Sequence, residues 1–167
     1  MSPPTSQQTT ATENLAAGFT ASTALAGDLQ RVLVDLIALH LQGKQAHWNV
    51  VGRNFRDLHL QLDEIVDAAR EFADTIAERM RALNAVPDGR ADTIAASTSL
   101  ARFPSGEQAT STVVDLITER LRRAAATARE VHDEVDREDP STADLLHAII
   151  DSLEKYAWMV SAENQTA

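Results

Sequence analysis

Glycine and proline are scarce in this 167-residue chain and lie mainly between long stretches of helix-forming residues. There are 6 glycines and 5 prolines, and residues 55–84 and 107–137 contain neither. Apolar side chains recur at helical spacing in these stretches and in residues 24–49 and 141–163. No stretch alternates polar and apolar residues as a half-buried strand does. The sequence therefore predicts four long helices and no strands.

The connections between these helices are expected to differ in length. Residues 85–106 join the second helix to the third and contain two of the prolines, and residues 91–97 within them suit a short helix. Pro140 suits the first position of the last helix, with Asp139 as its N-cap. A bundle with one long crossover is typical of ferritin-like folds. We therefore predict an all-α, ferritin-like four-helix bundle with a short extra helix in the long connection between the second and third helices.

The ends of the chain differ in composition from its middle. Residues 1–22 are rich in Ser, Thr, Gln and Pro and cannot bury enough apolar surface to offset their ordering entropy. We predict a flexible N-terminal tail over 1–22, one domain over 23–163, and a short C-terminal tail over 164–167.

The charge balance and the absence of cysteine exclude several classes of protein. The chain has 15 Lys and Arg against 25 Asp and Glu, a net charge of −10, which argues against a generic basic nucleic-acid binder and suits a surface that attracts cations. Without cysteine there can be no disulfide, thiolate zinc site, iron–sulfur cluster or Cys nucleophile. No apolar run approaches the ~18 residues of a membrane span, and no secretory signal is recognisable. The expected location is the cytoplasm, without a membrane partner.

One predicted helix carries an unusual stripe of metal-ligating side chains. At about 100° per residue, all of them fall on one face of the helix. The stripe comprises His59, Asp63, Asp67, Asp74 and Glu78. His59 and Asp63 are four residues apart, as are Asp74 and Glu78, so each pair can converge on one ion. The two pairs cannot share an ion within one chain, because Asp63 and Asp74 are separated by about 16 Å along the helix axis.

A two-fold axis would bring the two pairs together. If two copies of this helix pack antiparallel and cross near residues 68–69, His59 and Asp63 of one chain lie beside Asp74 and Glu78 of the other. His47, on the preceding helix, would complete a set of imidazoles and carboxylates that suits iron or manganese, with zinc as a further option. The alternative is a purely structural bundle whose acidic stripe is a solvated surface.

Several motifs resemble those of the Dps family, the miniferritins named as DNA-binding proteins from starved cells. The resemblance covers about residues 24–163. It rests on His47-Trp48-Asn49, Val51-Gly52, Phe55, Leu58-His59, Asp63 and Asp74-Thr75-Ile76-Ala77-Glu78-Arg79, and on Thr142-Ala143-Asp144-Leu145, Leu153-Glu154-Lys155 and Trp158 in the last helix.

This resemblance implies a homododecameric hollow shell that stores iron. The expected activity is that of a ferroxidase, which oxidises Fe(II) with hydrogen peroxide, or more slowly with dioxygen, and so protects DNA from oxidative damage. The family's ligands match His47, His59 and Asp63 of one subunit and Asp74 and Glu78 of its neighbour. No heme is expected, because the chain lacks the Glu-x-x-His pairs of bacterioferritin-like sites.

Four further residues match family positions near the iron. Lys44 corresponds to a residue that forms a hydrogen bond or ion pair beside the iron site. Trp48 corresponds to a tryptophan that either intercepts oxidising equivalents or serves as an aromatic packing residue. Asp139 and Asp144 correspond to positions that line three-fold pores for iron entry, where rings of carboxylates would concentrate cations.

DNA binding, which gives the family its name, is doubtful for this chain. Residues 1–27 and 161–167 contain no Lys or Arg, whereas DNA-binding members use basic tails. Twelve chains of net charge −10 would carry about −120 and repel DNA at ordinary salt. The alternative function, a nucleoid-associated protein that condenses DNA with secondary iron chemistry, is therefore disfavoured.

The remaining histidines and the one arginine-rich run have no obvious metal partners. His40 suits a core or interface position, while His132 is expected to be solvated and His147 has no acidic companions of the kind seen around His59. The arginines are expected to form ion pairs between subunits instead of contacting DNA. They are Arg120, Arg122, Arg123 and Arg129.

Overall fold

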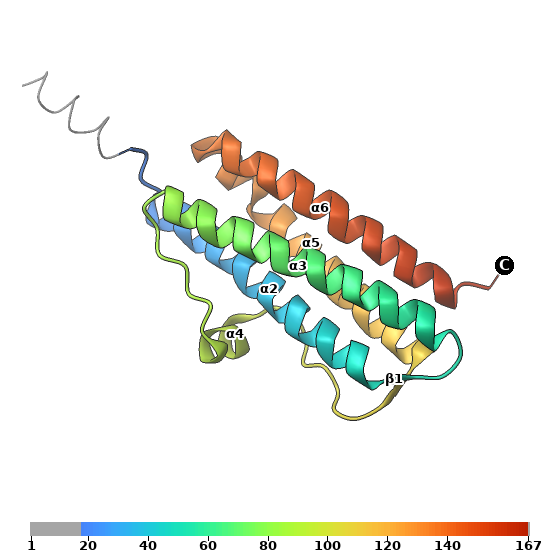
Figure 1. Cartoon of the computed structure of the whole chain (residues 1–167). Coiled ribbons are helices and arrows are strands. Elements are labelled where there is room, and N and C mark those ends of the chain that lie inside the picture. The colour runs from blue at the N-terminus through green and yellow to red at the C-terminus, as the bar shows by residue number, and fades with distance from the viewer. Residues whose placement is uncertain (1–17, 167) are drawn as a thin grey trace, which may run out of the picture.

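Four long helices form the bundle, as the distribution of glycine and proline predicts. The computed structural model describes residues 18–166. The helices are α2 (Thr23–Asn49), α3 (Phe55–Ala82), α5 (Thr110–Glu138) and α6 (Pro140–Ser161). They lie side by side along one bundle axis (Figure 1). The closest packing is of α2 on α3 and of α5 on α6, so the bundle consists of two helical hairpins. The all-α fold class is confirmed.

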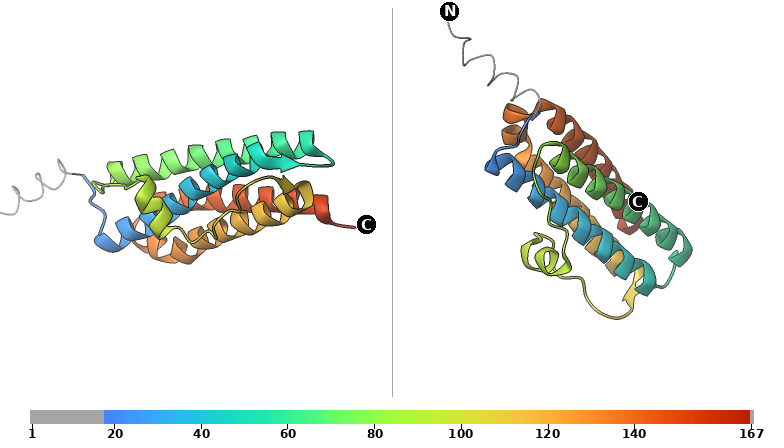
Figure 2. Two further views of the ribbon diagram at one scale, coloured as in Figure 1. Left: turned by 90° about the horizontal axis from the view of Figure 1, so that it is seen from below. Right: turned by 60° about the vertical axis from the view of Figure 1, so that its left-hand side comes forward.

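A single long crossover joins the two hairpins. It contains α4 (Ala91–Ser97), the short helix expected from the sequence. In Figure 2 this segment runs along the outside of the bundle, from the far end of α3 to the start of α5. The other two connections are short turns, which gives the one-crossover arrangement of a ferritin-like bundle.

The prediction that the chain contains no strands is wrong in one detail. Two short segments, β1 (Val50–Val51) and β2 (Gln108–Ala109), pair in parallel, with Val50 opposite Gln108. A two-residue bridge has no side-chain periodicity, so the sequence pattern contained no signal for it. The bridge ties the α2–α3 turn to the start of α5. After α6, a short 3-10 helix spans Ala162–Asn164.

Each helix buries one apolar face in a common core. On α3 the buried positions recur three or four residues apart, from Leu58 and Leu62 through Ile65 and Ala69 to Met80. The core is aliphatic, since its buried apolar side chains are those of Leu, Ile, Val, Ala and Met. Among the described residues, no helix is long and apolar enough to cross a bilayer.

A buried carboxylate fixes the crossover to the bundle. Asp35 on α2 is 2% exposed. It accepts hydrogen bonds from the hydroxyl of Thr98 at 2.8 Å, from the amide and hydroxyl of Ser99 at 2.7 and 2.5 Å, and from the hydroxyl of Thr127 on α5 at 2.7 Å. These four donors supply the hydrogen bonds that a buried carboxylate would otherwise take from water. This network joins α2, the crossover and α5.

The first described residues make specific contacts with the bundle. Ser22 caps α2, because its hydroxyl accepts the amide of Leu25 at 3.1 Å and donates to Glu138 at 2.6 Å. The amide of Ala21 donates to the carbonyl of Leu83 at 2.9 Å. These residues fall within the predicted tail of residues 1–22, of which residues 1–17 lie outside the described part of the chain.

One arginine of the arginine-rich run is buried and forms hydrogen bonds within its own chain. Arg120 is only 2% exposed, donates to the carbonyls of Ala101 and Arg102 at 3.0 and 3.1 Å, and lies 5.1 Å from the ring centroid of Phe103. The prediction that this run pairs with a neighbouring subunit is therefore wrong for Arg120, since its guanidinium fixes the crossover of its own chain. Nothing in the sequence pattern distinguishes this one arginine of the run as buried.

Candidate metal centre

The turn between α2 and α3 brings two of the predicted ligands together. Gly52 has φ +122°, a conformation that side chains disfavour, and a Cβ there would lie 3.3 Å from the hydroxyl of Thr110. Asn54 adopts the left-handed conformation at φ 59°, immediately before α3 begins. The chain therefore reverses within a few residues, which places the end of α2 beside the start of α3.

The ring of each of His47 and His59 contacts the backbone carbonyl of the other residue. His47 Nδ1 lies 2.9 Å from the carbonyl oxygen of His59, and His59 Nδ1 lies 3.0 Å from the carbonyl oxygen of His47. The two rings stack with centroids 3.6 Å apart. When each Nδ1–H donates to a carbonyl, each Nε2 keeps its lone pair as a metal ligand. The pair is thus preorganised for coordination.

Asp63 lies next to this pair and carries a negative charge. Its Oδ1 is 2.5 Å from Lys44 Nζ and 3.3 Å from His47 Nδ1. The hydrogen bond from Lys44 lowers the pKa of Asp63, against the smaller opposing effect of burial. The contact expected between Lys44 and the candidate site is therefore present. The three ligands predicted for one subunit, His47, His59 and Asp63, lie together at one end of the α2–α3 hairpin.

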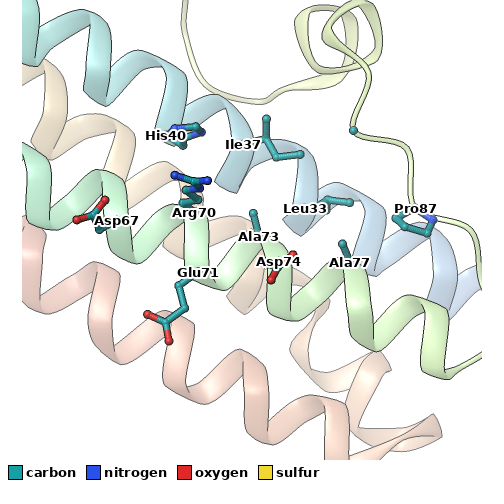
Figure 3. Close-up of a pocket in the computed structure, with 11 residues that line it drawn as sticks. Leu33, Ile37, His40, Asp67, Arg70, Glu71, Ala73, Asp74, Ala77 and Pro87 are labelled. Atoms are coloured by element: carbon teal, nitrogen blue, oxygen red, sulfur yellow. The ribbon is translucent and has the colours of Figure 1, made fainter.

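Asp74 and Glu78 lie further along α3 and are exposed. Asp74 lines a surface pocket of about 590 Å³ between α2 and α3, together with Asp67, Arg70 and His40 (Figure 3). Burial, followed by the nearby positive charges of Arg70 and Lys44, lowers the pKa of His40 and so favours its neutral form. This pocket is open along the face of α3 that carries the acidic stripe.

Within a single chain the ligands remain in two separate sets. Among the described residues, no group of three or more His, Asp or Glu side chains is arranged to hold a metal ion. Asp63 and Asp74 are eleven residues apart on one straight helix, a separation of about 16 Å. The pairing of both sets across a two-fold axis stays a prediction, and only a second chain can complete such a site.

Aromatic side chains near the two histidines are exposed in the single chain. Trp48 is 70% exposed and Phe55 is 43% exposed, and the Phe55 ring lies 5.0 Å from that of His59. Exposed aromatic rings beside a candidate site are typical of a surface that another molecule covers. Trp48 therefore has little packing within its own chain, and both roles expected for it stay predictions.

The two residues assigned to an entry pore have different environments. Asp139 accepts hydrogen bonds from Arg79 at 2.7 Å and from Thr142 at 2.5 Å, and its side chain is 13% exposed. Burial raises the pKa of Asp139, but the hydrogen bonds from Thr142 and Arg79 outweigh it and the net shift is downward. The side chain of Asp144 is 84% exposed. Only Asp144 has a carboxylate directed to solvent in the single chain.

A second histidine pair was missed by the sequence reasoning. His132 on α5 and His147 on α6 stack with centroids 4.5 Å apart, and their Nε2 atoms are 2.6 Å apart. His132 is therefore not simply solvated. His132 lies seven residues before Asp139, and His147 lies seven residues after Pro140. Because α5 and α6 form an antiparallel hairpin about this turn, the two histidines face each other. That symmetry about the turn was the available signal.

Comparisons with known proteins agree with the fold and with the motifs. A family model described as Ferritin-like domain matches residues 27–166. The chain is 37% identical over 134 residues to the DNA protection during starvation protein 2 of Deinococcus radiodurans, covering 80% of this chain but only 56% of that protein. It is 35% identical over 139 residues to the DNA protection during starvation protein of Brevibacillus brevis, covering 80% of this chain and 90% of the other.

A solved structure resembles the chain over nearly its whole length. It is described as the structure of Dps from Microbacterium arborescens in the high iron form, and it matches with a TM-score of 0.80 and 33% identity over 87% of this chain and 98% of the other. The match to the ferritin-like family model and the 98% coverage of this solved Dps structure agree with the helical bundle and its single crossover. The chain belongs to the Dps family of ferritin-like proteins.

Proposed function

We propose that this protein is a ferroxidase that oxidises Fe(II) at sites shared by two subunits and stores the ferric product inside a homododecameric shell. The observation that carries the proposal is the arrangement of His47, His59 and Asp63. Two stacked imidazoles with their Nδ1 atoms held by backbone carbonyls lie beside a carboxylate that Lys44 keeps ionised. This is a ligand set without sulfur, suited to ferrous iron as a substrate.

The second half of each site comes from the neighbouring chain. Asp74 and Glu78 are exposed on the same face of α3, and that face borders an open pocket. Antiparallel contact between two copies of α3 would place the histidine end of one chain beside the acidic end of the other. An isologous contact of this kind creates two equivalent sites per pair of chains.

The reaction needs ligands that hold iron in both oxidation states. Two ferrous ions each give one electron to hydrogen peroxide, which takes up two protons and leaves as two molecules of water. The carboxylates of Asp63, Asp74 and Glu78 neutralise the extra positive charge of the ferric product. Dioxygen serves as the slower oxidant. Because iron and peroxide are consumed together, hydroxyl-radical formation is suppressed and DNA is protected under oxidative stress.

Storage requires a closed shell and a route for iron. The homododecamer supplies the cavity, and the exposed Asp144 side chains would line its entry pores. Asp139, which is held by Arg79 and Thr142, would position the start of α6 behind them. The relative from Microbacterium arborescens is described in a high iron form, which supports iron as the cargo here. We place this activity in the cytoplasm.

The test is the oxidation of ferrous iron by the assembled protein. Anaerobic protein loaded with Fe(II) receives stoichiometric peroxide, and ferric absorbance is followed with a hydroxyl-radical trap present. Fast oxidation with little trapped radical, and iron co-eluting with the shell, is expected. The variant D74N/E78Q should oxidise iron at least about 10-fold more slowly at unchanged shell size.

A matched variant controls for the loss of negative charge. D57N/E64Q removes the same two kinds of carboxylate from α3, at exposed positions outside the acidic stripe, and should oxidise iron at the normal rate. An undiminished rate in D74N/E78Q would remove these residues from the site. Oxidation by the unaltered protein that is no faster than in buffer would refute the ferroxidase assignment.

A further inference from the structure

The second histidine pair lies in a pocket of its own, on the α5–α6 hairpin. His132 and His147 line a cavity of about 320 Å³ together with Asp151 and Glu154. His132 is partly buried, with 22% of its side chain exposed, whereas 61% of the His147 side chain is exposed. The pocket contains none of the residues assigned to iron oxidation, so a role for this pair does not depend on the proposed function.

Each of these histidines has a carboxylate beside its other ring nitrogen. His132 Nδ1 lies 3.0 Å from Asp133 Oδ1, and His147 Nδ1 lies 3.6 Å from Asp144 Oδ1. A carboxylate next to Nδ1 favours the tautomer with its proton on Nδ1 and leaves the Nε2 lone pair available. The same carboxylate–histidine arrangement orients metal-ligating histidines in proteins.

The two Nε2 atoms face each other 2.6 Å apart, so either a proton on one of them or a bound cation lies between them. With both Nδ1 atoms protonated and both rings neutral, two lone pairs would meet at 2.6 Å, which is repulsive. Either a shared proton or a metal ion relieves this repulsion. Two nitrogens bound to a tetrahedral zinc ion at its usual bond length lie about 3.3 Å apart. The pair therefore needs to open by only a small rotation of the exposed His147 side chain.

We propose that His132 and His147 form a second metal site, which binds a divalent transition-metal ion of the zinc type through their Nε2 atoms. Asp151 lies four residues after His147 on α6 and lines the same pocket, so its carboxylate can rotate in as the third ligand, with water completing the coordination. Asp133 orients the His132 imidazole through a 3.0 Å contact, and Asp144, 3.6 Å from His147 Nδ1, adds a negative charge beside the second ring.

The other charges of the pocket are compatible with a bound cation. The guanidinium of Arg129 also lines the pocket, but it is paired with Glu154 through hydrogen bonds of 2.6 and 2.9 Å. This pairing neutralises the one positive side chain lining the pocket. Asp133 and Asp151 then leave the lining with a net negative charge, which lowers the cost of bringing a divalent ion to two neutral imidazoles.

Zinc binding to the assembled protein tests this site. Titration calorimetry with Zn²⁺ is performed in the D74N/E78Q background, and the number of ions bound per chain is compared with and without H132Q/H147Q. We expect the histidine substitutions to remove one zinc ion per chain and to leave all other binding unchanged. Co²⁺ absorption should show the corresponding loss of a low-symmetry, nitrogen-containing site.

Further variants separate metal ligation from other roles of the pair. D133N keeps both ligands and should weaken zinc binding about 10-fold by releasing the His132 ring. D136N, which removes an exposed carboxylate from the same helix, should leave zinc affinity unchanged. The single variant H147Q, at the more exposed ring, covers the case in which the double variant fails to assemble, and it too should lose the ion.

The competing occupant is a proton shared by the two rings. In that case zinc stoichiometry and affinity would be the same with and without H132Q/H147Q at unchanged shell size, and that result would overturn the proposal. Metal ligation also requires neutral imidazoles, so zinc affinity at this site should fall on acidification. A site that bound zinc equally well at pH 5 and pH 7 would likewise contradict it.

Discussion

At the scale of single residues, the carboxylate of Asp139 joins two helices and makes the stability of the protein depend on pH. It lies immediately before α6 and holds Arg79 of α3 through a 2.7 Å ion pair, so it joins the two hairpins of the bundle. Its lowered pKa means that the folded state favours the ionised form. This contribution is fully present above the usual value of 3.8 for Asp and is lost as the pH falls through the lowered pKa.

The substitution D139N should therefore destabilise the protein only where the carboxylate is charged. Asn has nearly the same shape as Asp, so the change removes mainly the ion pair and costs about 1–2 kcal/mol at neutral pH. The difference in thermal midpoint between the two proteins, measured at one protein concentration, should shrink as the pH is lowered below 3.8. D136N is the control, and an equal difference at all pH values would contradict this role of the ion pair.

At this scale the sequence predicts which residue types are candidate ligands, but not which contacts hold their side chains in place. The i, i+4 spacing of His59 and Asp63 follows from helical geometry, and their proximity to His47 follows from the turn at Gly52. The reciprocal bonds between the rings and the two carbonyls depend on how closely α2 approaches α3. That distance is set by tertiary packing, which a one-dimensional pattern does not contain.

At the scale of elements, a glycine sets the approach of α2 to α3. A Cβ at Gly43 would lie 2.7 Å from Cγ2 of Val66, a buried and β-branched side chain with little freedom to move. Gly43 lies one turn before His47 on the same helix. The close contact at this position therefore supports the geometry of the histidine pair.

Two glycine substitutions on α2 should consequently have opposite effects. G27A meets nothing within 4 Å and should stabilise the protein by about 0.5–1 kcal/mol, because Ala favours the helix. G43A gains the same propensity but must push Val66 aside, and should destabilise by about 1–3 kcal/mol. Denaturant unfolding of both variants measures the difference. A stabilising G43A would show that the two helices can separate without cost.

The elements themselves were largely predictable, and the exceptions are contacts between segments. The four helices and α4 begin and end within a few residues of the expected positions, because glycine, proline and apolar spacing act locally. The β1–β2 bridge and the contact between His132 and His147 were not predicted. The bridge joins segments that are distant in sequence and too short for a periodic pattern, whereas the histidines are 15 residues apart and only their equal spacing from the α5–α6 turn indicated their contact.

At the scale of the assembled protein, the net negative charge favours binding of iron cations and disfavours binding of DNA. Twelve chains, each with a net charge of −10, carry about −120 before any iron is taken up. Residues 1–27 and 161–167 contain no Lys or Arg that could bind DNA phosphates and offset this repulsion. The proposed dodecamer, about 217 kDa from twelve chains of 18.1 kDa, should therefore attract cations and repel polyanions.

A gel-shift assay with duplex DNA tests this consequence. At low salt and pH 7, without added divalent cations, the shell should not retard the DNA at micromolar concentrations, because it offers no basic tail for phosphate contacts. A dodecamer carrying an added Lys-rich N-terminal tail is the positive control. Salt-sensitive retention of DNA by the unaltered protein would instead favour the nucleoid-associated function.

We propose that each oxidation site is shared between two chains, and complementation tests this sharing most directly. Two inactive variants, H59Q/D63N and D74N/E78Q, are co-expressed with different tags and purified through both. In a randomly mixed shell, half of the two-fold pairs contain one chain of each kind, and each such pair has one intact site. We therefore expect about a quarter of the normal ferrous oxidation activity.

The same two variants, assembled separately and then combined, provide the baseline for this measurement. They should show no recovery, because preformed shells hold both copies of each pair in the same inactive form. Recovery of about a quarter of the activity in the co-assembled shells alone would establish the shared site. Co-assembled shells no more active than the separately assembled mixture would contradict it, and would place the chemistry within a single chain or elsewhere.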